Sequence, residues 1–154
     1  MNDISSQTTV RTATPNDLAE MLSLVRDLAI YEESEHMLTA TIETYLESFK
    51  NGHFEGIVAE VNGTVVGTAI YYRRFSTWKG PILYLEDFVV RQSHRRQGVG
   101  KLLFEAFIEV AKTRKMAMCM WQVLDWNELA MSFYNKYDVT YDKGWFNVKL
   151  YLES

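Results

Sequence analysis

The most constraining feature of this 154-residue sequence is a short glycine-containing segment, Arg95 to Gly100, that separates two strongly patterned stretches. Before it, Ile82 to Val90 is apolar and rich in β-branched and aromatic residues, as is typical of a β-strand. After it, apolar side chains between Gly98 and Arg114 recur at helical spacing. The sequence therefore predicts a strand, a glycine-containing loop and an amphipathic helix in direct succession.

A loop in this position is suited to bind an anion. Glycine has no Cβ, so the backbone can approach a ligand closely. The first N–H groups of the following helix are unpaired and lie at the positive end of its dipole, where a pyrophosphate is the natural ligand. Arg95, Arg96 and Lys101 add positive charge. A solvated, glycine-rich helix cap is the alternative, and neither GxxxxGK[ST] nor GxGxxG is present, but the basic residues and the flanking elements favour an anion site.

Further elements are predicted by hydrophobic spacing, capping residues and turn residues. Thr14, Pro15 and Asp17 are typical of a helix start, and Asn62-Gly63 of a tight hairpin. In chain order we expect a short edge strand over 9–12, a helix from Pro15 that closes at 31–35, a helix over 41–50, strands over 56–61 and 64–74, a strand over 117–123, a helix over 127–137 and a final antiparallel strand over 145–152.

The order of these elements predicts the fold class. The run over 117–123 is apolar without alternation, as in a strand covered on both faces. A strand, a helix and a second strand form a crossover, so the strands over 82–90 and 117–123 should be parallel. We expect an α/β (α+β) fold with a mixed, mostly antiparallel sheet flanked by helices. The length fits one domain over 9–154, preceded by a disordered lead over 1–8.

Composition excludes several classes of protein. A formal net charge of -4 argues against general nucleic-acid binding. The one cysteine, Cys119, cannot form an intramolecular disulfide, and no cluster suggests a metal site, so a cytoplasmic location is expected. Met1 to Thr9 has no features of a signal peptide, and no apolar run approaches the roughly 20 residues of a membrane span.

Two segments carry a family resemblance. Arg95-x-x-Gly98-x-Gly100, after Leu85-Glu86-Asp87-Phe88-Val89-Val90, resembles the acetyl-CoA signature of the GNAT superfamily of N-acetyltransferases. Asn127-Glu128-x-Ala130-x-x-Phe133-Tyr134 resembles its second conserved segment. The chain from about Val10 to its C-terminus is similar, more narrowly, to spermidine/spermine and thialysine N-acetyltransferases. The resemblance implies the GNAT acyl-CoA N-acyltransferase fold, with a central parallel strand pair.

The resemblance also implies an acetyl-CoA site. The pantetheine arm would pair with the backbone of the strand before the loop, and the loop would hold the pyrophosphate. Asn127 would bind the arm, unless it is only a helix cap. The implied cofactor-binding residues are Phe88, Val89, Val90, Arg95, Arg96, Gln97, Gly98, Val99, Gly100, Lys101, Asn127, Ala130 and Phe133.

The role of Tyr134 follows from the same resemblance, and that of Glu86 from its charge and its place on the strand. Tyr134 would be the general acid that protonates the departing thiolate, although a tyrosine on an amphipathic helix is more often part of a core. Glu86 would attract a cationic amine and take its proton, because a primary amine with a pKa of about 10.4 is charged at neutral pH. Adjacent carboxylates within Leu85 to Val90 are costly to bury without a purpose. Implied acceptor-binding residues are Tyr31, Glu32, Glu86, Asp87 and Trp121.

The expected activity is therefore transfer of an acetyl group from acetyl-CoA to a primary amine of a small di- or polyamine, or of a lysine-like amino acid, by direct attack. The family implies a homodimer in which the final strand contributes to the interface, without a nucleic-acid or membrane partner. Arg96, Ala130, Ser23 and the tight hairpin depart from the polyamine enzymes and leave the amine open. A GNAT acting on a peptide N-terminus or an aminoglycoside, and a non-catalytic acyl-CoA-binding domain, are the alternatives.

Overall fold

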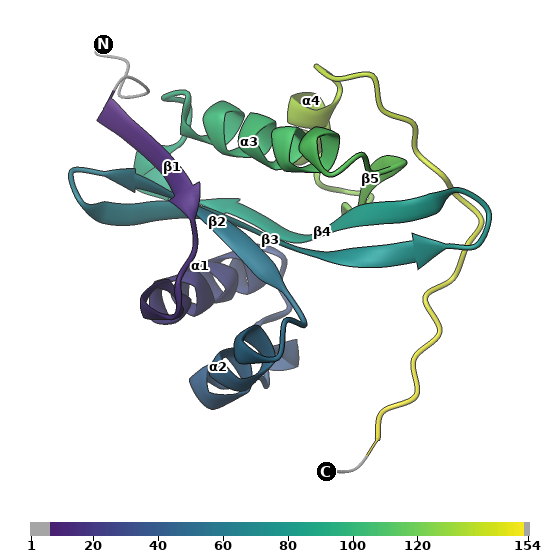
Figure 1. Ribbon diagram of the computed structural model, residues 1–154, viewed down its shortest axis with the longest axis horizontal. Helices are drawn as coiled ribbons and strands as arrows, with labels where there is room; N and C mark the ends of the chain where they lie inside the picture. The colour runs from purple at the N-terminus through teal and green to yellow at the C-terminus, as the bar shows by residue number, and fades with distance from the viewer. Residues whose placement is uncertain (1–6, 153–154) are drawn as a thin grey trace. The chain divides into compact units, whose positions relative to one another are not determined.

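A computed structural model of the protein describes residues 7–152. The chain divides into two units, one that ends at Gln122 and one that begins at Val123. The first unit is a mixed sheet with helices against both of its faces (Figure 1). The second contains one short helix followed by chain without regular structure.

The sheet of the first unit follows chain order, β1-β2-β3-β4-β5. Neighbouring strands are antiparallel except β4 and β5, which are parallel and joined through a helix. These findings confirm the expected meander, its hairpin at Asn62-Gly63 and the crossover. The bounds are β1 (Thr8–Thr12), β2 (Glu55–Val61), β3 (Thr64–Ser76), β4 (Gly80–Val90) and β5 (Met118–Trp121).

Helices α1 (Leu18–Tyr31) and α2 (Ile42–Lys50) lie on one face of the sheet, and α3 (Val99–Thr113) lies on the other (Figure 1). The α1 side is filled by apolar side chains at helical spacing that pack on alternate residues of the strands, among them Leu18, Met21, Leu24, Val58, Ile70 and Val89. On the α3 side Phe104 and Phe107 are fully buried. Their rings lie 5.5 Å from Phe88 and 5.6 Å from Tyr71, so both faces of β3 and β4 are anchored.

The start of α1 is fixed by the residues that predicted it. A short 3₁₀ turn, Pro15–Asp17, precedes the helix, and Asp17 accepts a hydrogen bond of 2.8 Å from the Thr14 backbone N–H. Arg11 donates two hydrogen bonds, of 2.8 and 2.9 Å, to the buried Asp17 carboxylate. This pairing lowers the pKa of Asp17 and ties β1 to the helix. For α2, Thr41 accepts from the Thr44 backbone N–H at 3.3 Å and caps the helix at the predicted position.

Two expectations for the sheet need correction. The strand over 117–123 is shorter than expected, Met118–Trp121, and is partly exposed rather than covered on both faces. It is the last strand of the described sheet, so only one of its edges is paired. At the other end, Thr8 already belongs to β1, and the rest of the expected lead, residues 1–6, lies outside the described part of the chain.

The second unit contains α4 (Glu128–Tyr134), which is shorter than the expected 127–137. The final strand predicted over 145–152 is wrong: these residues have no regular structure. Phe146, Val148 and Leu150 are 93, 93 and 86% exposed. Apolar side chains of this spacing indicate a strand only where a neighbouring strand completes the ladder, and no described strand pairs with this segment. Among residues 7–152, no helix is both long and apolar enough to cross a membrane.

Candidate active site

A β-bulge in β4 brings two carboxylates to the same face of the sheet. Ile70 pairs with Asp87, yet the next residue of β3, Tyr71, pairs with Leu85, so Glu86 is the extra residue. Side chains alternate along a regular strand, and adjacent residues would point to opposite faces. The bulge interrupts that alternation, and Glu86 and Asp87 both line a pocket on the α1–α2 side. The two carboxylates that are adjacent in the sequence therefore face the same pocket.

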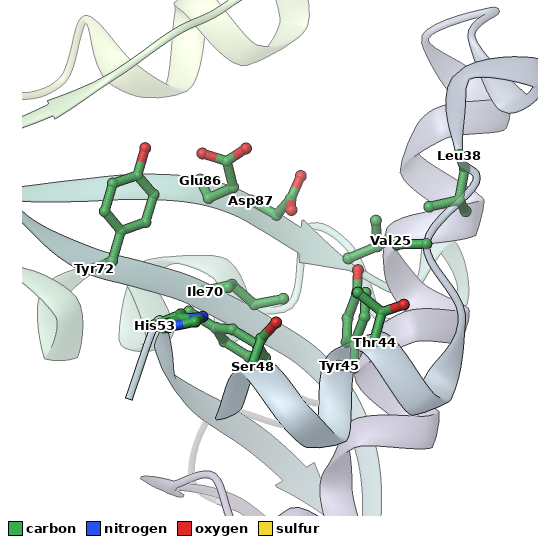
Figure 2. Close-up of a pocket in the computed structure, with 12 residues that line it drawn as sticks. Val25, Leu38, Thr44, Tyr45, Ser48, His53, Ile70, Tyr72, Glu86 and Asp87 are labelled. Carbon is green, nitrogen blue, oxygen red and sulfur yellow. The ribbon is translucent and has the colours of Figure 1, made fainter. Parts of the chain in front are cut away.

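The pocket has a volume of about 420 Å³ (Figure 2). Its sheet wall is made by Ile70, Tyr72 and the two carboxylates, and its other walls come from α1, α2 and the segments that flank α2. Apolar groups dominate these walls. The full lining is Val25, Leu38, Ala40, Thr44, Tyr45, Ser48, His53, Phe54, Ile70, Tyr72, Glu86 and Asp87.

Burial and nearby negative charge make Asp87 unusual. Burial, followed by the negative charges of Glu86 and Glu32, raises the pKa of Asp87 to about 7. Burial also raises the pKa of Glu32, which follows the last residue of α1. The structure therefore brings three of the predicted acceptor-binding residues, Glu32, Glu86 and Asp87, into one acidic cluster. A cation bound there would relieve their repulsion.

The remaining predicted acceptor-binding residues lie differently. Tyr31 ends α1 and is 40% exposed, and its ring lies 5.9 Å from the guanidinium carbon of Arg95. Trp121 ends β5, and its ring meets Phe104 edge-on at 5.4 Å. Phe104 belongs to α3, which covers the opposite face of the sheet, and Trp121 is not part of the pocket lining. The Trp121 ring therefore packs on the α3 side of the sheet, although its backbone pairs with Leu85, the residue before Glu86.

The basic loop has the geometry of an anion site. Gly98 precedes α3 in a left-handed conformation, with φ 86°, and contributes no side chain that caps the helix. A Cβ at Gly100 would meet only ordinary contacts, the nearest at 3.7 Å, so this glycine leaves the approach to the helix end open. Arg96 and Lys101 are exposed beside it. Arg95 is used differently, because its Nε donates to the Val90 carbonyl at 3.0 Å.

In the second unit, Asn127 caps α4. Its Oδ1 accepts a hydrogen bond from the Ala130 backbone N–H at 3.2 Å, so the helix-cap alternative for Asn127 is realised. Tyr134, at the end of α4, is buried. The ring of Phe133 lies 5.7 Å from Tyr134 and 5.8 Å from Tyr137. These contacts fix the aromatic end of the helix.

Comparison with known families decides the class of protein. Residues 18–138 match the model of the Acetyltransferase (GNAT) family. The chain belongs to this family. The match spans both the acidic strand and α4, and it makes the protein an acetyltransferase enzyme with the fold expected from the sequence.

Individual relatives agree with this assignment. The chain is 29% identical over 142 residues to thialysine N-epsilon-acetyltransferase of Caenorhabditis elegans, covering 90% of this chain and 89% of the relative. It is 33% identical to the enzyme of the same name from Bos taurus, covering 88% of each. Among solved structures, an aminoglycoside acetyltransferase from a soil metagenome aligns with a TM-score of 0.80 at 20% identity, covering 97% of this chain and 99% of the other. That likeness is one of fold.

GNAT acetyltransferases use acetyl-CoA, and the residues of this GNAT chain fit such a ligand. The ladder between β4 and β5 runs only from Ile82 to Leu85. Beyond Leu85, β4 continues to Val90 with β3 on one side and no strand of the described sheet on the other. An extended arm could add to this edge as a strand does, and it would lead to the uncapped N-terminus of α3. Among residues 7–152, no group of three or more His, Cys, Asp or Glu side chains is arranged so that it could hold a metal ion.

Sequence reasoning missed the α2 wall of the pocket. Thr44, Tyr45 and Ser48 of this GNAT chain line it, as do His53 just after the helix and Tyr72 on β3. A signal was available, because Tyr45 and Ser48 place hydroxyls on the otherwise apolar stripe of a helix predicted to pack on a sheet. The bulge that turns Glu86 and Asp87 toward this wall had no comparable signal.

Proposed function

We propose that this GNAT enzyme transfers an acetyl group from acetyl-CoA to a primary amine of a small di- or polyamine, or of a lysine-like amino acid, by direct attack. The single observation that carries the proposal is the pair Glu86 and Asp87, turned to one face by the bulge into an apolar pocket of about 420 Å³. Carboxylates attract a cationic amine, and apolar walls suit its methylene chain. The relatives named as thialysine N-epsilon-acetyltransferases support an acceptor of this kind.

Glu86 is the proposed base. A primary amine with a pKa of about 10.4 must lose a proton before it can attack. Glu86 is exposed and lies on β4 just after Leu85, where the pairing with β5 ends. It can take that proton directly or through water. Asp87 and Glu32 would hold the cation before the proton is lost, because both belong to the acidic cluster. Tyr31 and Trp121 remain candidates for the rim of the acceptor site.

Acetyl-CoA supplies an activated acetyl group as a thioester when it is bound. The backbone of Phe88, Val89 and Val90 would align its arm, and the loop from Arg95 to Lys101 would hold its pyrophosphate. Asn127, Ala130 and Phe133 are further proposed contacts of the cofactor, as the family resemblance implies. Tyr134 is the proposed general acid, because its phenol can hold a proton for the departing sulfur.

The activity is tested by thiol release from acetyl-CoA with spermidine, 1,4-diaminobutane, thialysine and lysine as acceptors. We expect turnover with at least one of them. Glu86→Gln should lower kcat/KM for that amine more than tenfold at pH 7, and less as the pH approaches the pKa of the amine. Exposed Glu109 on α3 provides the matched control, Glu109→Gln, which should behave as the wild type. Absence of turnover with every acceptor would overturn the proposal.

We further propose that the enzyme is one acetyltransferase domain over 9–154, that it is cytoplasmic and that it forms a homodimer. The dimer is supported by the exposed apolar side chains over 145–152. Their exposure to water is unfavourable, and a second copy would cover them. The family resemblance implies the same segment at the interface.

A further inference from the structure

The α2 wall of the pocket faces the acidic pair with hydroxyl groups. Tyr45 and Ser48 lie on the side of α2 that faces the sheet, across the pocket from Glu86 and Asp87 (Figure 2). Both residues are partly buried. A molecule in the pocket would therefore contact carboxylates at one wall and hydroxyls at the other.

The Tyr45 side chain packs against a second aromatic ring. Its ring meets Phe54 edge-on at 5.7 Å, and Phe54 in turn meets Phe49 at 5.6 Å. The backbone is fixed at the capped start of α2, where the Tyr45 N–H donates to the Thr41 carbonyl at 3.1 Å. The hydroxyl thus has a defined position, as required of a group that discriminates between ligands.

The charge around this hydroxyl is negative. Burial, followed by the charges of Asp87 and Glu86, raises the pKa of Tyr45 to about 12, so the phenol stays protonated. Among the residues that line the pocket, His53 is the one side chain that can become cationic, and it is exposed. A ligand must therefore bring its own positive charges, and a ligand carboxylate would face the acidic pair.

We infer that Tyr45 determines acceptor specificity: its hydroxyl accepts a hydrogen bond from a second ammonium group, so that linear diamines bind in preference to monoamines and to amino acids with the same side chain. This inference rests on the proposed function, with Glu86 serving the amine that reacts. Glu86, Asp87 and Glu32 provide the negative field that both ammonium groups share.

The test compares 1,4-diaminobutane with n-butylamine, which has the same chain and one amine. Tyr45→Phe keeps the ring and removes the hydroxyl. We expect its KM for the diamine to rise roughly five- to twentyfold, as for loss of a hydrogen bond to a charged group. Its KM for butylamine, or its inhibition constant if butylamine is not turned over, should stay within about twofold, as should its KM for acetyl-CoA.

Tyr71→Phe is the matched control, because Tyr71 is a buried tyrosine that packs on Phe107 at the opposite face of the sheet. It should leave both amines unaffected. In the double variant with Asp87→Asn, the loss of diamine affinity should be smaller than the product of the single losses, since both groups act on the same ligand. Equal effects of Tyr45→Phe on the two amines, or none, would overturn the inference while turnover by the wild type upheld the proposed function. If the wild type acetylates spermidine, thialysine or lysine but neither acetylates nor binds 1,4-diaminobutane, the inference alone falls; absence of turnover with every acceptor overturns the proposed function as well.

Discussion

At the scale of single residues, the surroundings of Asp87 oppose its negative charge. Burial, followed by the negative charges of Glu86 and Glu32, raises its pKa to about 7. A carboxyl whose ionisation is disfavoured does not stabilise the folded chain. Its presence here is better explained by a role in ligand binding. Ionised Asp87 should therefore lower the unfolding free energy of the ligand-free enzyme.

Asp87→Asn should stabilise the free enzyme at pH 8. The pKa of Asp87 is higher in the folded chain than the ordinary 3.8, so the folded state favours the protonated form. Stability is then lost as the pH rises from about 4 through 7. We expect a gain in unfolding free energy of about 1–3 kcal/mol at pH 8, shrinking between pH 7 and pH 4, as measured by urea denaturation. Asp125→Asn, at an exposed position, should show no such pH-dependent gain.

Tyr134 is a residue for which the sequence alone favoured a core role over a catalytic one. Tyr134→Phe should lower kcat more than tenfold, because the phenol proton is lost, while acetyl-CoA binding measured by calorimetry is kept. Tyr137→Phe is an informative control, since the rings of both tyrosines contact Phe133. Equal kcat values for the two variants would refute the assignment of Tyr134 as general acid.

Among the elements, β4 shows where sequence reasoning succeeded and where it stopped. Its apolar run predicted a strand, and its carboxylates predicted a site. The bulge at Glu86 depends instead on two anchors: Tyr84 lies beside Tyr72, with ring centroids 5.3 Å apart, and Val89 packs in the α1 core. Both side chains lie on the same face although five positions separate them, which a regular strand cannot achieve. Only tertiary packing sets that condition.

The loop before α3, like β4, was predicted only in part from the sequence. The glycines and basic residues of the sequence predicted an anion site here, but they did not predict the shape of its backbone. Arg96 has a φ of 63°, in the left-handed region that favours glycine. The polyamine enzymes that the chain resembles are expected to carry glycine at this position. Arg96 therefore adds positive charge but introduces local backbone strain.

Arg96→Gly should separate these two effects. Relief of the left-handed conformation should leave the unfolding free energy unchanged or raise it by up to about 1 kcal/mol. Loss of the charge should raise the KM for acetyl-CoA roughly three- to tenfold, and less in high salt. Lys115→Gly tests the same backbone change, at φ 56° just beyond the other end of α3, and should leave that KM unaltered. An unchanged KM in Arg96→Gly would show that the arginine does not contact the cofactor.

At the scale of the whole molecule, the net charge of -4 divides into regions of opposite sign. The basic residues of the loop surround the N-terminus of α3, while Glu32, Glu86 and Asp87 cluster beside the pocket. An anionic cofactor and a cationic acceptor would therefore be attracted to different parts of one sheet. The sequence contained this division, although the average charge concealed it.

The segment over 145–152 gives the remaining prediction at this scale. Within the described chain its large apolar side chains are exposed, Trp145 at 80% and Phe146 at 93%. Covering such a side chain is worth about 1.5–3 kcal/mol, so a segment with several of them should be covered in solution by a second copy. We expect the wild type to sediment as a dimer and a chain that ends at Gly144 to sediment as a monomer.

Point variants distinguish a specific interface from a general effect of truncation. Adjacent residues of an extended segment point in opposite directions, so Val148→Glu should weaken the dimer strongly and Lys149→Glu only slightly. Sedimentation equilibrium at several concentrations measures both, and thermal denaturation shows whether the monomer stays folded. A monomeric wild type at tens of micromolar would rule out the dimer. Equal weakening by the two variants would instead indicate that charge, rather than a buried apolar face, governs the association.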